Sequence, residues 1–182
     1  MKIYDCFMFF DEEMLLDLRL NIMDKYVDKF VITEATYTHS GNSKKLIFDI
    51  NKFSKFKDKI IYIVVDKPPH DLFKIDDNDS LNEKQSKMTL NAKKREMYQI
   101  NKTQDGIADA NQDDIIIISD LDEIPNLEKV NLKTINQKLI FFKQKMFYYK
   151  LNLFHKSLPW YGSKACKKKI LQNTGKATIN KK

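Results

Sequence analysis

The residues best suited to chemistry in this chain are three carboxylates, Asp120, Asp122 and Glu123, which follow one another closely in the stretch DDIIIISDLDEIP. Clustered negative charges are stabilised by a cation, and carboxylate oxygens are hard ligands, so the group suits Mg²⁺ or Mn²⁺ holding a phosphate-bearing substrate. Acidic residues after a strand also form ordinary turns or helix N-caps. At this stage both interpretations, a metal site and a structural turn, remain open.

Four isoleucines directly before the cluster predict the element that positions it. A run of β-branched residues with no polar face is typical of a central parallel strand buried on both sides, and we expect this strand over residues 115–119. Pro125 cannot continue a sheet ladder, so the strand ends before it. Ligands of open α/β sheets bind beyond the carboxyl ends of the strands, which is where the carboxylates fall.

Strands and helices alternate along the first two thirds of the chain. Apolar and β-branched runs predict strands over residues 2–10, 30–35 and 60–66, and helical spacing of apolar residues predicts helices over 12–26 and 83–100. This alternation predicts an α/β domain with a mostly parallel central sheet flanked by helices. Polar loops are expected over residues 36–43 and 70–82, the second of them mobile.

The last third of the chain is less regular. Residues 139–149 and 151–154 are apolar and aromatic, and we expect them to pair as strands, followed by an aromatic loop over residues 157–162. From residue 166 the chain is polar and rich in lysine, which predicts a frayed tail. We therefore assign one domain to residues 1–165 and a tail to residues 166–182.

Composition excludes several classes of protein. With 182 residues and 42% hydrophobic residues, the chain is long and apolar enough for one globular domain. The net charge of +7 comes from lysines, since Arg19 and Arg95 are the only arginines, and base-reading proteins usually need arginine, so no specific nucleic-acid partner is expected. No apolar run approaches the ~20 residues of a membrane span, and no signal peptide is evident. Cys6 and Cys166 are expected to be free thiols, and the localisation cytoplasmic.

Several stretches in order resemble glycosyltransferase family 17, the group typified by the β-1,4-mannosyl-glycoprotein β-1,4-N-acetylglucosaminyltransferase that bisects N-glycans. They are IYDCFMFFDEEMLLDLRLN, VDKFVITEATYTHSG, KIIYIVVD, the REMYQ segment, DDIIIISDLDEIP and FFKQKMFYYKLN, which together cover residues 2–162. The resemblance implies a GT-A-like nucleotide-binding domain in which an Asp-x-Asp motif holds a divalent metal, Mn²⁺ or Mg²⁺, against the donor diphosphate. Asp120 and Asp122 match that motif, and Glu123 is expected to join or orient the metal ligands.

Other positions acquire expected roles through the same resemblance. Glu34, at the end of the second predicted strand, is expected near the nucleoside, with a solvated strand-end acid as the alternative. Arg19 and Arg95 are candidates for the donor phosphates, and for Arg19 a structural ion pair is the alternative. The polar loop containing His39 is expected at the same rim, with His39 itself on the surface.

Two departures from the family pattern concern the acceptor side. The family has a Gln-Arg pair before the metal strand, whereas Gln99 is followed here by Ile100. Family members also continue into a Gly-Trp-His-containing segment expected to line the acceptor site, and this chain is short of it. No residue is therefore assigned as general base, although Asp66, Asp77 and Asp79 are possible sources. The aromatic loop with Trp160 offers a stacking surface for a sugar or a cap on the core.

These observations lead to one functional prediction and two alternatives. We predict a metal-dependent inverting glycosyltransferase that moves a sugar, by resemblance N-acetylglucosamine from UDP-GlcNAc, onto a glycan acceptor. The first alternative is a non-catalytic nucleotide-sugar or glycan-binding remnant that lacks the acceptor half. The second is a two-metal phosphoryl-transfer or nuclease-like enzyme, which ranks last because no second acidic cluster has suitable spacing.

Overall fold

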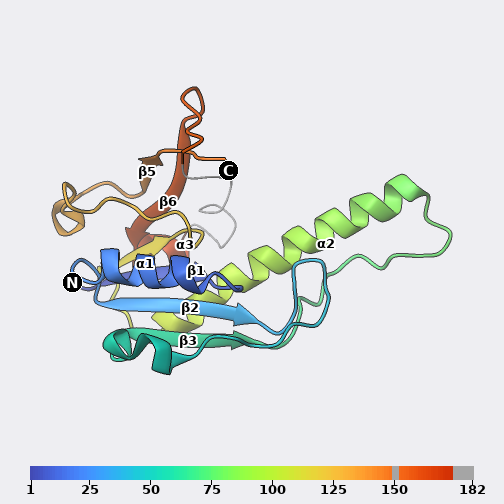
Figure 1. Cartoon of the computed structure of the whole chain (residues 1–182), viewed down its shortest axis with the longest axis horizontal. Coiled ribbons are helices and arrows are strands. Elements are labelled where there is room, and N and C mark those ends of the chain that lie inside the picture. The colour runs from blue at the N-terminus through green and yellow to red at the C-terminus, as the bar shows by residue number, and fades with distance from the viewer. Residues whose placement is uncertain (149–151, 174–182) are drawn as a thin grey trace.

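The fold is an α/β domain built on one six-stranded sheet, shown in a computed structural model that describes residues 1–148 and 152–173 (Figure 1). The strand order is β3-β2-β1-β4-β6-β5. The strands are β1 (Ile3–Met8), β2 (Lys29–Ala35), β3 (Ile60–Val65), β4 (Ile115–Ile118), β5 (Ile140–Gln144) and β6 (Trp160–Lys167). The first four run parallel, and β6 is antiparallel to both of its neighbours, β4 and β5, so five of the six strands share one direction. This confirms the predicted α/β class with a mostly parallel sheet.

The isoleucine run forms the central strand that its sequence predicts. Ile115–Ile118 constitute β4, which lies between β1 and β6, and all four residues are buried. Ile115 and Ile117 pack in one hydrophobic cluster with Phe7 and Leu16, whereas Ile116 and Ile118 pack in a second cluster. The two clusters cover opposite faces of the sheet because successive strand residues point to opposite sides. The second cluster also contains Cys6 and Cys166, which are free thiols.

Helices cover the two faces unequally. Helix α1 (Glu13–Met23) packs on one face through Leu16, Leu20 and Met23. Helix α2 (Leu81–Lys102) reaches the other face only with its C-terminal part, and its N-terminal half projects from the body (Figure 1). A Ser80–Glu83 capping box starts this helix, which stabilises its projecting end. Shorter elements are the 3₁₀ turns η1 (Ile50–Phe56), η2 (Thr103–Ile107) and η3 (Leu132–Thr134), and α3 (Lys168–Asn173).

The loop before α2 lies along the projecting half of the helix. Asn91 on the helix accepts a hydrogen bond from the Phe73 backbone N–H at 2.7 Å and donates one to its carbonyl at 2.8 Å. Ion pairs Lys87–Asp79 and Lys94–Asp71 add two more ties. The segment that we expected to be a mobile loop is thus connected to the helix at several points, including a hydrogen bond from Lys84 to the Asp77 carbonyl. No described helix is long and apolar enough to cross a membrane.

The last third of the chain differs from its prediction. Strand β5 pairs with β6, not with residues 151–154, although Phe147 and Phe154 form an isolated antiparallel bridge. The expected aromatic loop supplies the beginning of β6, and residues 166–173, assigned to the tail, form the end of β6 and α3. Most of this strand was hard to recognise from the sequence because residues 162–167 are small or polar, yet residues 162–166 are all buried between β4 and β5. Residues 149–151 and 174–182, which complete those predictions, lie outside the described residues.

Candidate functional site

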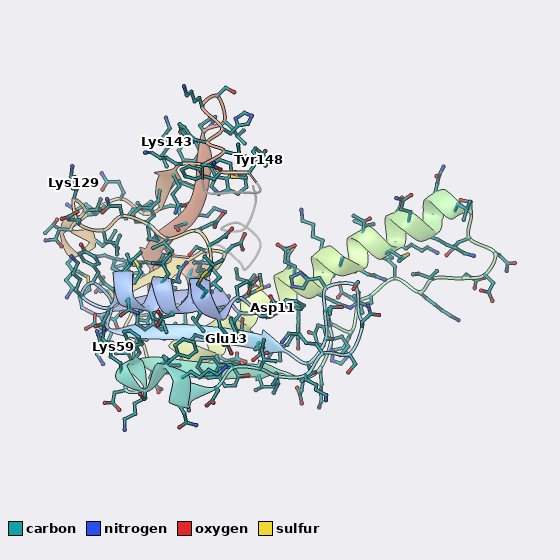
Figure 2. The ribbon with its side chains drawn as sticks, in the orientation of Figure 1. Asp11, Glu13, Lys59, Lys129, Lys143 and Tyr148 are labelled. Atoms are coloured by element: carbon teal, nitrogen blue, oxygen red, sulfur yellow. The ribbon has the colours of Figure 1, made fainter. Side chains whose placement is uncertain are left out.

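A cleft of about 630 Å³ opens at the carboxyl ends of β1 and β4. The chain passes from β1 to β2 and β3 on one side of the sheet and then crosses from β3 to β4, on the other side of β1. The strand order therefore reverses between β1 and β4, and such a topological switch point is where α/β sheets bind ligands. Helices α1 and α2 border it, and Figure 2 shows Asp11 and Glu13 where α1 begins, at the end of that helix nearer to α2. The lining comprises residues 8–10, 38–40 and 120–122 together with Glu12, Leu15, Glu96 and Gln99.

Asp120 and Asp122 both line this cleft, as the Asp-x-Asp interpretation requires. They lie on a tight turn directly after β4, which is closed by a hydrogen bond of 3.1 Å from the Glu123 backbone N–H to the Asp120 carbonyl. The Asp122 side chain is exposed and takes part in no hydrogen bond or ion pair among the described residues. Asp120 is half-buried beside it. The turn thus directs one carboxylate outward while the backbone beneath it is fixed.

Glu123 closes the turn and faces away from the solvent. One carboxylate oxygen accepts from the Asp120 backbone N–H at 3.0 Å, and the other accepts from the Trp160 indole N–H at 2.8 Å. The residue is only 8% exposed. With both oxygens engaged in this way, Glu123 orients the turn. Glu123 lies outside the cleft lining, so of its two expected roles, joining or orienting the metal ligands, its contacts match the second.

Strand β6 holds Glu123 from the other side. The Ser163 hydroxyl donates to the Glu123 carbonyl at 2.6 Å, and a Cβ atom at Gly162 would lie 2.5 Å from the Glu123 Cδ. A Cβ at position 162 would have to displace the Glu123 carboxylate from its hydrogen bonds, so glycine fits this close approach. Trp160, Gly162 and Ser163 together dock the turn against β6, so Trp160 serves as an anchor of this turn.

Arg19 lies beneath the same turn and is fully buried. Its guanidinium forms a bidentate pair with Asp5, with Nε and Nη2 at 2.9 and 2.7 Å from the two carboxylate oxygens. The remaining donors reach the carbonyls of residues 120, 121 and 123 at 3.0 to 3.2 Å and the Ser119 hydroxyl at 2.5 Å. Of the two roles expected for Arg19, the structural ion pair matches its position. The side chain organises the Asp-x-Asp turn from below and does not line the cleft.

Glu34 is also buried, away from the cleft lining. Its carboxylate accepts hydrogen bonds from the Ile47 and Phe48 backbone N–H groups at 2.9 and 3.1 Å, from the Tyr62 hydroxyl at 2.7 Å and from Lys44. Burial alone raises the pKa of Glu34, but these donors outweigh it and lower the pKa below its usual value. Glu34 thus fixes the segment that follows the 36–43 loop, and neither a nucleoside contact nor a solvated position matches this environment.

Arg95 supports the rim of the cleft from behind. Its guanidinium donates to the His39 carbonyl at 3.0 Å and lies against Gly41, where φ is +98° and a Cβ atom would approach the guanidinium nitrogen to 2.7 Å. Thr38, His39 and Ser40 line the cleft, as expected for this loop, but Arg95 is not among the lining residues. Its direct link to the site is through the backbone that presents His39.

Among the polar lining residues, Glu12 and Glu96 had no role assigned from the sequence, and Gln99 was noted only because Ile100 follows it. Glu12 is held by the backbone N–H groups of residues 10 and 11 at 3.2 and 3.1 Å, and buried Gln99 donates to the Thr33 carbonyl at 3.1 Å. Glu96 is exposed on α2, and its side chain forms no hydrogen bond or ion pair among the described residues. The i, i+3 spacing of Glu96 and Gln99 on a capped helix was the available signal. Asp66, Asp77 and Asp79, the earlier candidates for a base, do not line the cleft.

The carboxylates that line the cleft can be compared with the ligands that a divalent cation takes in proteins. Within residues 1–148 and 152–173, no group of three or more His, Cys, Asp or Glu side chains is placed to hold a metal ion. Two carboxylates at a switch point still match the way Mg²⁺ binds through one or two protein carboxylates plus substrate phosphates. The cleft therefore has the chemistry needed to hold a divalent cation together with an anionic ligand.

Comparison with protein families gives one match. The family model described as Glycosyltransferase family 17 matches residues 1–175, nearly the whole chain. Comparison with curated proteins gave no match. Comparison with solved structures gave none either.

Proposed function

Because the chain belongs to glycosyltransferase family 17 and is therefore a glycosyltransferase, we propose that it transfers N-acetylglucosamine from UDP-GlcNAc to a glycan acceptor. The proposal includes a GT-A-like mode of donor binding, with a divalent metal at Asp120 and Asp122. The observation that carries it is the position of these two carboxylates in the cleft at the β1–β4 switch point, on a turn that Arg19 and Glu123 fix from within.

The two carboxylates fit a metal that bridges protein and donor. Asp122, which is exposed and accepts no hydrogen bond among the described residues, is the direct ligand in this proposal, and Asp120 contacts the metal or the donor ribose. Mn²⁺ or Mg²⁺, when bound, stabilises the negative charge of the departing diphosphate. The chain contributes a preorganised turn, because a loop that is already fixed needs no reorganisation when the charge develops.

We place the proton acceptor on helix α2. An inverting transfer needs a base that takes the proton from the attacking acceptor hydroxyl as the new glycosidic bond forms. Glu96 lines the cleft and has no competing partner among the described residues, whereas the Glu12 carboxylate is engaged by two backbone N–H groups. Glu96 is therefore the proposed base, and Gln99, which lies one turn further along the same face, borders the acceptor.

The test separates donor binding from transfer. Thermal unfolding is followed with UDP alone, Mn²⁺ alone and both together, and UDP release from UDP-GlcNAc is then assayed with simple glycan acceptors. We expect UDP to stabilise the protein only with Mn²⁺, and Glu96→Gln to retain this stabilisation while losing at least about a hundredfold in turnover, the usual contribution of a general base. Glu128→Gln, an exposed carboxylate outside the cleft lining, is the matched control.

Each outcome has a distinct meaning for the proposal. Stabilisation by UDP and Mn²⁺ without turnover of any acceptor would favour a nucleotide-sugar binder. Loss of UDP binding in Glu96→Gln would move this residue from the acceptor side to the donor side. The absence of any response to UDP, with or without metal, would overturn the donor site altogether.

A further inference from the structure

Charge is divided unevenly along the chain. All 25 acidic residues lie in the first 128 positions, where they outnumber 18 basic residues, and residues 129–182 contain 14 lysines and no Asp, Glu or Arg. The first part therefore carries a formal charge of −7 and the second +14, which combine to the net +7 of the chain. A lysine surface that lacks acidic partners attracts anions over the range of the Debye length.

The structure places much of this charge on an open surface. Lysines 129, 133, 138, 143, 145 and 156 are all exposed, and none forms an ion pair among the described residues. The remaining described lysines of this region are accounted for differently: Lys164 and Lys168 are buried, and Lys167 and Lys169 pair with Asp113. Figure 2 shows Lys129 and Lys143 on the part of the molecule that lies away from β2 and β3.

Large apolar side chains accompany the lysines on β5, on β6 and on the segment that joins these two strands. Lys143 pairs directly with Tyr161, and Phe147 with Phe154, so the members of each pair point to the same side. Lys145 lies over the Phe154 ring at 5.9 Å. Phe141 is exposed on β5 like Lys143, with buried Phe142 between them, although the pairing with β6 has a register irregularity at this point. We call these six residues the basic aromatic face; Phe141, Tyr161 and Phe154 are 51%, 50% and 42% exposed.

Within this face, Lys143 and Tyr161 point away from the Asp-x-Asp turn. Gln144 and Trp160 are the neighbouring pair on the same two strands, and they point to the opposite side, where Trp160 donates to Glu123. A partner on the basic aromatic face therefore leaves the contacts of the Asp-x-Asp turn intact.

We propose that the basic aromatic face binds the surface of an anionic phospholipid membrane. Lysines beside an anionic bilayer each contribute attraction, and aromatic and other apolar side chains enter the headgroup region, so the two kinds of residue act together. A nucleic acid or a soluble acidic polymer matches the charge alone, and sites for such phosphates use arginine forks, of which this region has none. The exposed phenylalanines distinguish a membrane surface from those partners.

The experiment measures partitioning of the full chain onto vesicles. Vesicles of phosphatidylglycerol and phosphatidylcholine are compared with pure phosphatidylcholine, at low salt and at 0.5 M NaCl. The variant Lys143→Glu/Lys145→Glu is compared with Lys45→Glu/Lys57→Glu, which makes the same change of charge at two exposed lysines elsewhere. Phe154→Ser tests the apolar contribution, and duplex DNA serves as the soluble polyanion.

We expect binding to anionic vesicles only, weakened by salt. Since each lysine near an anionic surface contributes about fivefold, the double variant should bind at least about 25-fold more weakly. The control double variant should lose far less, and Phe154→Ser should weaken binding at both salt concentrations. Circular dichroism spectra that match the wild type show that each variant is folded.

Three results would overturn the proposal. They are no binding to anionic vesicles, equal weakening by the two double variants, and binding to DNA at a strength that matches or exceeds binding to vesicles. Because vesicle binding does not use the cleft, failure here leaves the donor experiment with UDP and Mn²⁺ unaffected, and the two proposals are judged separately.

Discussion

Replacement of Arg19 by methionine tests whether the buried guanidinium holds the Asp-x-Asp turn. Methionine retains an unbranched apolar side chain but removes the charge and all donors. Asp5 then remains fully buried without its cation, and the carbonyls of residues 120, 121 and 123 lose the shared donor. Removing one partner of a buried pair costs about 3–5 kcal/mol. This is a large part of the roughly 5–15 kcal/mol that stabilises a typical domain.

The assay is equilibrium unfolding in urea, with a surface ion pair as the matched control. Lys52 and Glu13 form such a pair, with side chains 52% and 40% exposed, and Lys52→Met is expected to cost no more than about 1 kcal/mol. The double variant Asp5→Leu/Arg19→Met removes both charges, so it should be more stable than Arg19→Met alone. Equal destabilisation by Arg19→Met and Lys52→Met would refute the reasoning.

A conservative variant separates the charge from the geometry. Arg19→Lys retains the positive charge near Asp5 but cannot reproduce the planar fork that reaches five acceptor groups. We expect Arg19→Lys to fold with intermediate stability and to bind UDP and Mn²⁺ more weakly than the wild type, because its turn is less fixed. Wild-type affinity in a folded Arg19→Lys protein would show that the donor site does not depend on this network.

Two further predictions concern the supports of the cleft. Gly162→Ala introduces a Cβ at 2.5 Å from the Glu123 Cδ, which should cost about 1–3 kcal/mol in urea unfolding and weaken Mn²⁺-dependent UDP binding; unchanged values for both would contradict the docking of the turn on β6. Because the pKa of Glu34 is lowered in the folded state, its ionised carboxylate stabilises the protein above the unfolded-state pKa of about 4.3. This contribution is lost as pH falls through the lower folded pKa. In Glu34→Gln, the free energy of unfolding should therefore fall less steeply with decreasing pH than in the wild type. Stability curves of equal steepness for wild type and Glu34→Gln, measured by urea unfolding from pH 6 downward, would show that the four donors to Glu34 do not couple to folding.

Local sequence was enough to predict the strand that carries the site. The run Ile115–Ile118 forms β4 as predicted, since four consecutive β-branched residues favour a strand buried on both faces, and Asp120 and Asp122 after it line the cleft. The parallel strands β1, β2 and β3 were predicted from the same kind of pattern, because they are apolar and because apolar residues recur at helical spacing in the connecting helix α1.

The helical spacing of α1 already indicates that the Arg19 side chain points into the core, although arginine side chains are usually exposed. Leu16, Arg19, Leu20 and Met23 are the buried residues of α1, at the i, i+3, i+4, i+7 spacing of a single stripe. A charge on that stripe requires a buried partner, and Asp5 on the adjacent strand provides it. The helix pattern therefore contained the position of Arg19, whereas its contacts with residues 120–123 depend on tertiary structure.

The part of the site that sequence reasoning missed depends on contacts between distant segments. Trp160 reaches Glu123 from 37 positions away, and β6 is recognisable only once β4 and β5 are in place on either side. Its small and polar residues have no strong strand pattern, so their burial comes from the sheet that surrounds them. Glu123 was a candidate metal ligand because it follows Asp122 directly. Its carboxylate instead accepts hydrogen bonds from the Asp120 backbone and from distant Trp160, and the second contact depends on tertiary structure.

The most direct test of the account is whether a divalent cation binds at Asp122 together with the donor diphosphate. Binding of Mn²⁺ is followed by electron paramagnetic resonance with and without UDP, in the wild type, in Asp122→Asn and in Asp58→Asn, an exposed aspartate outside the cleft lining. We predict that UDP strengthens Mn²⁺ binding in the wild type and in Asp58→Asn, and that Asp122→Asn loses this effect. Equal UDP-dependent binding of Mn²⁺ in all three proteins would contradict the assignment of the cleft as the donor site.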